Sequence, residues 1–308
     1  MQGSTTWSRP FARSSAVVPD ACPLCGAALV PGHGFVVDGQ KYAHCPGCHA
    51  DVETPLPDPE AWAAFYRDRY HQAPGAAEAS ARRQRMLSRL LAMIPRRPPG
   101  RLLDAGCGGG YLLALARAAG WEVAGVDPST EACALARSRW KIEVQAVLLE
   151  ESVLPEASFD VVTLINVLDQ APHPVRLLAA ARRALRPGGL LVARVPNGDF
   201  HRAAWAAIRR LPPSAAERLR PLVIFHPLCL NARALRALLG RAGLVRLRLG
   251  NAPLSGPEGS VSVGAAGRTA LASLAGLAQA GAHLAARLSA DRVLWAPSLL
   301  ALAEPEAA

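Results

Sequence analysis

The stretch from residue 102 to residue 110 reads LLDAGCGGG, and it decides the fold. An apolar run ends at Asp104, a glycine-dense turn follows, and a segment with helical period begins at Tyr111. Glycine suits a turn at which the backbone must approach a ligand closely, because a Cβ would fill the space. The stretch therefore predicts a strand, a ligand-binding turn and a helix.

A second acidic residue lies at the spacing that a nucleoside requires. Asp127 ends the next apolar run 21 residues after Gly106. A carboxylate about 20 residues beyond such a turn can accept hydrogen bonds from both ribose hydroxyls. NAD is a poorer ligand, because its fingerprint would place glycine where Tyr111 stands and would not begin with Asp104.

Four segments together resemble class I S-adenosylmethionine-dependent methyltransferases. Residues 104–110 resemble their motif I and residues 125–129 (GVDPS) their second motif, and the match continues through 159–162 (FDVV) and 185–190 (LRPGGL). The resemblance implies an enzyme that transfers a methyl group from S-adenosylmethionine.

The same resemblance assigns the cofactor-binding residues. Gly106, Gly108 and Gly110 would line the methionine part of S-adenosylmethionine, Asp104 would hold its amino group, and Asp127 would bind its ribose. Asn166 should lie near the sulfonium. Many relatives have an aspartate where this chain has Leu148, so backbone groups around Leu149 and Glu150 are expected to hold the adenine.

The catalytic part of the chain alternates short apolar runs with helix-period segments. This alternation is typical of βαβ units and a parallel sheet. We predict an α/β fold with a Rossmann-like, doubly wound, mostly parallel sheet and a small N-terminal zinc ribbon. Strands are expected at 101–104, 121–127, 142–147, 160–166, 190–195, 244–249 and 294–303, and helices at 111–119, 131–140 (capped by Ser129), 174–185 and 232–242.

The residues after the fourth strand depart from the subfamily that the chain most resembles, bacterial small-molecule methyltransferases with an N-terminal zinc motif. Leu-Glu-His is common there, whereas this chain has Leu168-Asp169-Gln170, and Gln170 cannot act as a base. His226 is the predicted general base, because histidine titrates near neutrality, with a loop or packing role as the alternative. His173 and His201 are weaker candidates.

Two C-x-x-C pairs, Cys22/Cys25 and Cys45/Cys48, are separated by 19 residues. This spacing is typical of a zinc ribbon, and four thiolates form a closed, structural site. Disulfides are the alternative, as is ligation by His44 or His49. The ribbon either caps the acceptor pocket or binds nucleic acid, and the second role is disfavoured because Lys41 is its only strong cation.

Charge and length set the remaining expectations. The formal charge of +10 comes almost wholly from arginine, with ten arginines and one acid between residues 201 and 250. These basic stretches favour an anionic acceptor, and the shortage of cations in the ribbon favours a small molecule over RNA. We expect a flexible tail (1–20), a zinc ribbon (21–54), a helical connector (55–99) and a methyltransferase domain (100–308).

The N-terminus lacks a continuous apolar stretch, which predicts a cytoplasmic protein. Residues 269–286 are expected to form a soluble helix, with contact to a membrane surface as the alternative. The acceptor is expected to be a sugar, nucleotide-sugar or lipid-linked intermediate. An rRNA methyltransferase and a non-catalytic S-adenosylmethionine sensor are the competing functions.

Overall fold

The computed structural model describes residues 19–30, 33–68, 81–94, 99–253, 281, 284–285, 288 and 294–306. Nearly all of the expected tail (1–20) lies outside these residues, as does most of the helix expected at 269–286. None of the described helices combines the length and the hydropathy that a bilayer-spanning segment needs.

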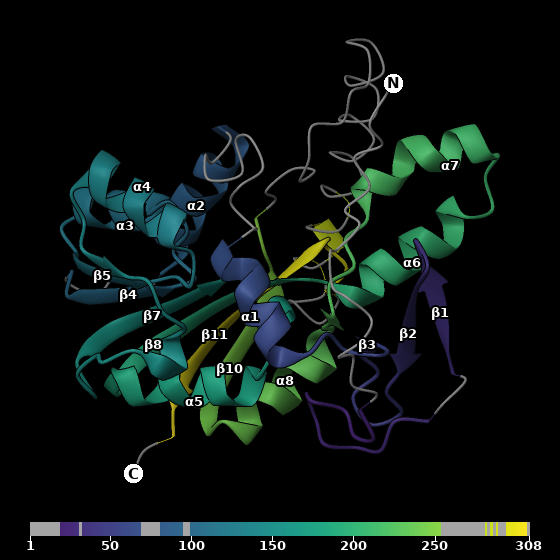
Figure 1. The fold of residues 1–308 in the computed structure, drawn as a ribbon, viewed down its shortest axis with the longest axis horizontal. Helices are drawn as coiled ribbons and strands as arrows, with labels where there is room; N and C mark the ends of the chain where they lie inside the picture. The colour runs from purple at the N-terminus through teal and green to yellow at the C-terminus, as the bar shows by residue number, and fades with distance from the viewer. Residues whose placement is uncertain are drawn as a thin grey trace.

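A seven-stranded sheet forms the centre of the molecule, in the order β10-β11-β8-β7-β4-β5-β6 (Figure 1). Neighbouring strands from β8 to β6 are parallel, whereas β11 is antiparallel to both β8 and β10. The strands are β4 (Arg101–Ala105), β5 (Glu122–Val126), β6 (Val144–Gln145), β7 (Phe159–Ile165), β8 (Leu185–Pro196), β10 (Leu244–Asn251) and β11 (Ser298–Pro305). The order reverses beside β4, which confirms the predicted doubly wound, mostly parallel sheet.

Helices cover both faces of this sheet and bury two separate apolar clusters. One face carries α2 (Ala81–Met93), α3 (Tyr111–Ala118) and α4 (Thr130–Trp140), and the other carries α5 (Pro174–Ala184) and α8 (Ala232–Arg241). Ser129 caps α4 as predicted, since its hydroxyl accepts from the Ala132 amide at 3.2 Å. The expected connector (55–99) includes α1 (Pro59–Asp68), whose buried Trp62 belongs to the apolar cluster on the side of α5 and α8.

A smaller, four-stranded sheet takes three of its strands from the expected zinc ribbon (residues 21–54), which we call the cysteine module. Its order is β1 (Gly34–Val37), β2 (Gln40–His44), β3 (Asp51–Glu53) and β9 (Leu228–Cys229). The last strand comes from the catalytic part of the chain, a pairing that the sequence did not predict. α6 (Gly198–Ile208) and α7 (Pro213–Leu219) follow β8 and lie near β1 and β2 in Figure 1.

All seven predicted strands are present with shifted bounds, and the pairing of two of them explains the shift. The strand expected at 142–147 is only Val144–Gln145, because this edge strand pairs with β5 through two residues. The strand expected at 190–195 begins earlier, at Leu185, because the ladder already pairs Leu185 with Phe159 and resumes at Leu190 with Val161. Residues 186–189 are therefore an irregularity within one strand.

Candidate active site

The glycine turn leaves the carboxyl end of β4 and leads into α3. The Gly106 and Cys107 amides both donate to the Val126 carbonyl, at 2.8 and 3.1 Å. Gly106 has a φ of +77°, and a Cβ built there would lie 2.5 Å from Val167 Cγ2. Any side chain at this position would be strained and would clash, so the turn needs glycine.

Asp127 follows β5 and is held by the backbone beside the glycine turn. Its two carboxylate oxygens accept from the Gly108 amide at 2.8 Å and the Ser129 amide at 2.9 Å. The structure thus brings the two predicted cofactor motifs together. Asp127 is 7% exposed, and the two amides fix the orientation of its carboxylate.

Asp104 lies at the end of β4 in the same region. The Thr163 hydroxyl donates to its Oδ1 at 2.6 Å. Burial, reinforced by the negative charge of Asp127, raises the pKa of Asp104 to about 7. A buried carboxyl with a pKa near 7 is suited to a cationic partner, because a nearby positive charge favours the ionised form.

Asn166 follows β7 with a positive φ of 60°. Its Oδ1 accepts from the guanidinium of Arg194, a buried residue of β8 that also donates to Ser298 Oγ at 2.9 Å. Gln170 donates to the Asn166 carbonyl at 2.9 Å and accepts from the Tyr66 hydroxyl. Arg194 and Tyr66 are site residues that sequence reasoning missed, since both lie on elements without a motif.

His226 is paired with Asp169. Its Nδ1 contacts Asp169 Oδ2 within hydrogen-bonding distance, while the Asp169 side chain is 1% and the His226 side chain 20% exposed. If Nδ1 donates to the Asp169 carboxylate, the other ring nitrogen, Nε2, is left to accept a proton. This is the arrangement of a base and its orienting group.

Asp169 is the most important residue that the sequence reasoning did not assign. It belongs to a short 3₁₀ turn, Leu168–Gln170, directly after β7. Its other oxygen, Oδ1, is buried and has no hydrogen-bond partner among the described residues. The signal was present, because Asp169 stands where relatives carry the acid of Leu-Glu-His.

The predicted adenine region is a second 3₁₀ turn, Leu149–Glu151. The Leu149 side chain is buried, and its carbonyl accepts from Ser152 Oγ at 2.7 Å. Glu150 Oε2 is buried and finds no hydrogen-bond partner in the described part of the chain, and burial raises the pKa of this carboxyl. The turn therefore offers an acceptor that a ligand amino group would satisfy.

The two weaker histidine candidates lie in different surroundings. His201 is 1% exposed; its Nε2 donates to the Pro297 carbonyl at 3.0 Å and its Nδ1 accepts from the Ile224 amide at 3.3 Å. Burial lowers the pKa of His201 to about 4, so the ring is neutral and both nitrogens are engaged. His173 is exposed at the start of α5.

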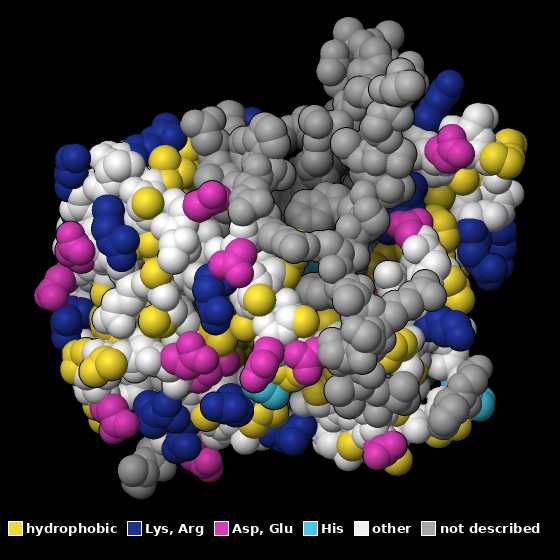
Figure 2. Space-filling model, in the orientation of Figure 1, with side chains coloured by type: hydrophobic (Ala, Val, Ile, Leu, Met, Phe, Trp, Pro, Cys, Tyr) yellow, Lys and Arg dark blue, Asp and Glu magenta, His cyan; other side chains and the backbone are white. Residues whose placement is uncertain are grey.

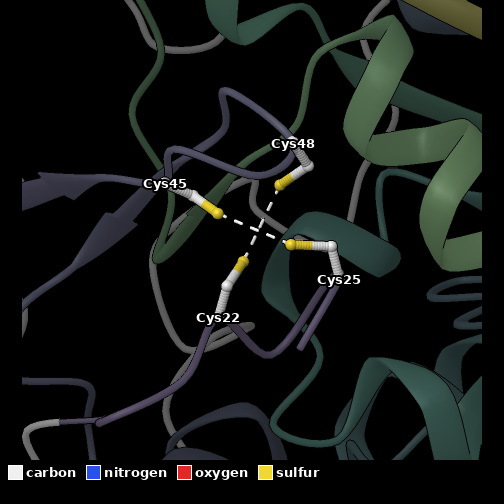
Figure 3. Close-up of side chains that lie close together, drawn as sticks. All are labelled: Cys22, Cys25, Cys45 and Cys48. Carbon is white, nitrogen blue, oxygen red and sulfur yellow. Dashed lines mark hydrogen bonds between the residues drawn. The ribbon is translucent and has the colours of Figure 1, made fainter. Parts of the chain in front are cut away.

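The four cysteines of the two knuckles form one cluster. Their sulfur atoms lie within 4.8 Å of one another and point toward a common centre (Figure 3). Cys22 Sγ is 3.8 Å from Cys48 Sγ, and Cys25 Sγ is 3.5 Å from Cys45 Sγ. Zn–S bonds of about 2.3 Å in a tetrahedron place the sulfurs about 3.8 Å apart, so the cluster fits zinc.

The alternatives to cysteine ligation are not formed among the described residues. All seven cysteines are free thiols, so neither knuckle is a disulfide. His44 and His49 instead contact each other at 3.3 Å, and His44 Nδ1 lies 2.8 Å from Asp51 Oδ1.

Comparison with known proteins identifies the family. Residues 78–248, more than half of the chain, match the methyltransferase domain family. The chain therefore belongs to this family.

Two relatives show how far the sequence similarity extends. A protein of Mycobacterium tuberculosis named probable S-adenosylmethionine-dependent methyltransferase is 35% identical over 154 residues, covering 50% of this chain and 52% of that protein. The ubiquinone biosynthesis O-methyltransferase of Aromatoleum aromaticum is 35% identical over 114 residues, covering 35% of this chain and 49% of that protein. The matches thus span about half the length of these curated relatives.

Solved structures share the fold. A chain from the complex of a Haloferax volcanii methyltransferase with its activator has a TM-score of 0.53 at 17% identity, covering 79% of this chain and 98% of that chain. A phosphoethanolamine N-methyltransferase of Haemonchus contortus, bound to S-adenosylhomocysteine, has a TM-score of 0.51 at 18% identity, covering 82% of this chain and 62% of that chain. The methyltransferase fold therefore covers most of the chain.

Proposed function

We propose that this protein is an S-adenosylmethionine-dependent methyltransferase that methylates a hydroxyl group of a small molecule, such as a sugar, a nucleotide-sugar or a lipid-linked intermediate. The observation that carries the proposal is the Asp169–His226 pair, because Asp169 lies four residues after the end of β7, the strand that pairs with β4 of the cofactor motif. A hydroxyl acceptor needs a base, whereas the sulfonium needs no further activation.

The cofactor is assigned to residues at or after the carboxyl ends of β4, β5, β6 and β7. The glycine turn at Gly106–Gly110 would take the methionine part, Asp104 the amino group and Asp127 the ribose. Leu149 and Glu150 would take the adenine, with the orphaned Glu150 oxygen accepting from the 6-amino group. Asn166 lies at the end of β7, the position assigned to the sulfonium region. When bound, S-adenosylmethionine supplies an electrophilic methyl group.

The protein's own part in the reaction is proton transfer and alignment. His226 Nε2 takes the proton from the acceptor hydroxyl, and the Nδ1 proton stays hydrogen-bonded to Asp169, which stabilises the imidazolium that forms. Gln170 holds the Asn166 carbonyl and the Tyr66 hydroxyl, and thereby ties α1 to the end of β7. Such fixed geometry supports in-line transfer.

Surface charge supports a small molecule over RNA. On the face shown in Figure 2, the described Lys and Arg side chains alternate with Asp and Glu over the helices that flank the sheet. Arg220, in the turn after α7, is paired with Asp38 of the cysteine module at 2.5 Å, and Arg202 of α6 is paired with Asp51 at 3.4 Å. Arginines engaged with acids are less available for phosphates than free ones.

The test compares His226→Gln and Asp169→Asn with the parent protein. S-adenosylmethionine binding is measured by calorimetry, and S-adenosylhomocysteine release is followed with pools of nucleotide sugars, sugars or RNA. We expect turnover to fall about 10²- to 10⁴-fold for His226→Gln with cofactor affinity unchanged. His173→Gln is the matched control and should keep full turnover, because this exposed ring lies at the start of α5 away from the pair.

Three results would decide against the proposal in different ways. Full turnover by His226→Gln would remove the base assignment. Release of S-adenosylhomocysteine only with RNA would favour the rRNA methyltransferase. Cofactor binding without turnover in any pool would favour the non-catalytic sensor.

A further inference from the structure

Strand β9 connects the cysteine module to the residue that we assign as the base. β9 begins two residues after His226 and pairs with β3, with Cys229 opposite Asp51 and Leu228 opposite Val52. The Glu53 amide extends this pairing, since it donates to the Pro227 carbonyl at 2.8 Å. The backbone that follows His226 is therefore an edge strand of the cysteine module.

β3 in turn starts at the second cysteine knuckle. The His49 amide donates to the Cys45 carbonyl at 2.9 Å, and the Cys45 amide donates to the Ala50 carbonyl at 2.8 Å. These bonds close the turn that carries Cys45 and Cys48. The turn ends at Ala50, the residue before Asp51. The position of β3 therefore depends on the conformation of this knuckle.

Asn231 makes a second connection between the knuckle and the catalytic domain. Its side-chain amide donates to the His49 carbonyl at 2.8 Å, and its Oδ1 accepts from the Ala234 amide at 2.8 Å as the N-cap of α8. Asn231 is 2% exposed. The segment from Pro227 to Asn231 is thus bonded to the cysteine module at both of its ends.

Arg202 of α6 adds a third contact, to the first residue of β3. Its guanidinium lies 3.4 Å from Asp51 Oδ1 and 3.0 Å from Asp199 Oδ1. Asp51 is 1% exposed and is the residue that pairs with Cys229 in the two-strand ladder. β3 is therefore held between the knuckle, β9 and α6.

We propose that the metal-loaded cysteine cluster positions His226 against Asp169 by fixing β3 and β9, and that Asn231 is a positioning residue in this connection. The inference rests on the proposed function only in taking His226 as the base. It gives the cysteine module a role on the acceptor side of the active site, because the position of His226 then depends on the geometry of this module.

The cofactor side has its own supporting bonds within the central sheet. The Gly106 and Cys107 amides donate to Val126 of β5, the Asp127 amide donates to Gln145 of β6, and the Asp127 carboxylate accepts from Gly108 and from Ser129, the N-cap of α4. Loss of zinc should therefore loosen residues 226–231 while residues 101–127 keep their structure. This difference makes the inference testable without an acceptor.

The experiment measures amide hydrogen exchange by mass spectrometry on the full chain, with and without zinc. We expect exchange in residues 226–231 to accelerate at least about tenfold on zinc removal, because local opening controls exchange. Residues 101–127 should change less than about twofold, and S-adenosylhomocysteine affinity should be retained. Unchanged exchange in residues 226–231 would overturn the inference even if the protein is an active methyltransferase.

A variant covers the case in which zinc removal unfolds the whole chain. Asn231→Ser keeps an N-cap oxygen for α8 but lacks the amide that reaches His49. With zinc bound, it should show faster exchange at residues 226–231, unchanged zinc content and an unchanged cofactor Kd. Turnover should fall several-fold through kcat while KM for the acceptor changes little, because the base is displaced and the pocket is kept.

Non-additivity distinguishes a connection from two unrelated effects. If Asn231 transmits the knuckle's position, zinc removal from Asn231→Ser should add less acceleration at residues 226–231 than it adds in the parent. Fully additive effects, or parental exchange and turnover in zinc-loaded Asn231→Ser, would overturn the proposal. Failure of turnover in the parent with every acceptor would contradict the proposed function and leave this exchange result intact.

Discussion

Replacing Asp104 by asparagine should stabilise the ligand-free protein at pH 8 and weaken cofactor binding. Burial and the charge of Asp127 raise the pKa of Asp104 from 3.8 to about 7. Because the folded chain binds the proton more tightly than the unfolded chain, stability is lost as pH rises from about 4 to about 7. Above pH 7 the native state carries the full cost of a buried charge.

The magnitude follows from the size of that shift. A change of about 3 pKa units corresponds to about 4 kcal/mol in favour of the neutral form. Asparagine keeps the acceptor for the Thr163 hydroxyl, but its new amide must find partners, which costs about 1–3 kcal/mol. The net gain is therefore about 1–3 kcal/mol, or a rise in Tm of roughly 1.5–5 °C at pH 8 for a chain of 308 residues.

Calorimetric melting at pH 8 and pH 5, with and without S-adenosylhomocysteine, measures both effects. The gain for Asp104→Asn should shrink at pH 5, where Asp104 is already protonated. Saturating ligand should raise the Tm of the parent more than that of the variant, because the ligand's ammonium loses its charged partner. Glu143→Gln, at a side chain that is 96% exposed, controls for the loss of one negative charge. A lower Tm at pH 8 together with unchanged ligand affinity would refute the reasoning.

Four further outcomes follow from the site and the core. Asp127→Ala should raise the Kd for S-adenosylmethionine about 100-fold or more by calorimetry, because hydrogen bonds to a charged group contribute about 1.5–3 kcal/mol each; an unchanged Kd would remove the ribose assignment. Glu150→Gln should reduce the preference for S-adenosylhomocysteine over its 6-oxo analogue in competition binding, and an unchanged preference would place the adenine elsewhere. Cys45→Ser should reduce bound zinc from one per chain toward zero by elemental analysis and lower the Tm by at least about 5 °C, since structural zinc contributes to folding; full zinc content would exclude Cys45 as a ligand. Burial lowers the pKa of His201 to about 4, so stability should fall as pH falls from about 6.5 to about 4, and His201→Gln should flatten this part of the melting profile, with an unchanged pH slope as the contrary result.

The sequence was most informative where one short segment determines the local geometry. The glycine turn specifies its own conformation, because Gly106 has a positive φ and no room for a Cβ. The spacing to Asp127 is equally local, since one βαβ unit joins the two. The parallel sheet and the cysteine cluster follow from comparable short-range patterns.

The sequence could not specify contacts that depend on how distant segments pack. Asp169 and His226 are 57 residues apart, and their pairing follows from the path of the chain through α5, β8 and α6. β9 is two residues long, too short for periodicity to indicate a strand, and it exists because β3 offers it an edge. Arg194 lies in an apolar strand, and only the structure brings its guanidinium to Asn166.

The departure at Leu168-Asp169-Gln170 has a physical explanation in this arrangement. The sequence alone indicated the loss of a base, because Gln170 stands where relatives commonly have histidine. The acidic residue before it remains, and its carboxylate is the partner of His226. Gln170, with both a donor and an acceptor, instead bridges the Asn166 carbonyl and the Tyr66 hydroxyl, which histidine could do only with one tautomer. The substitution therefore fits a methyltransferase that keeps one oriented base at His226 and uses position 170 to hold α1 over the end of β7.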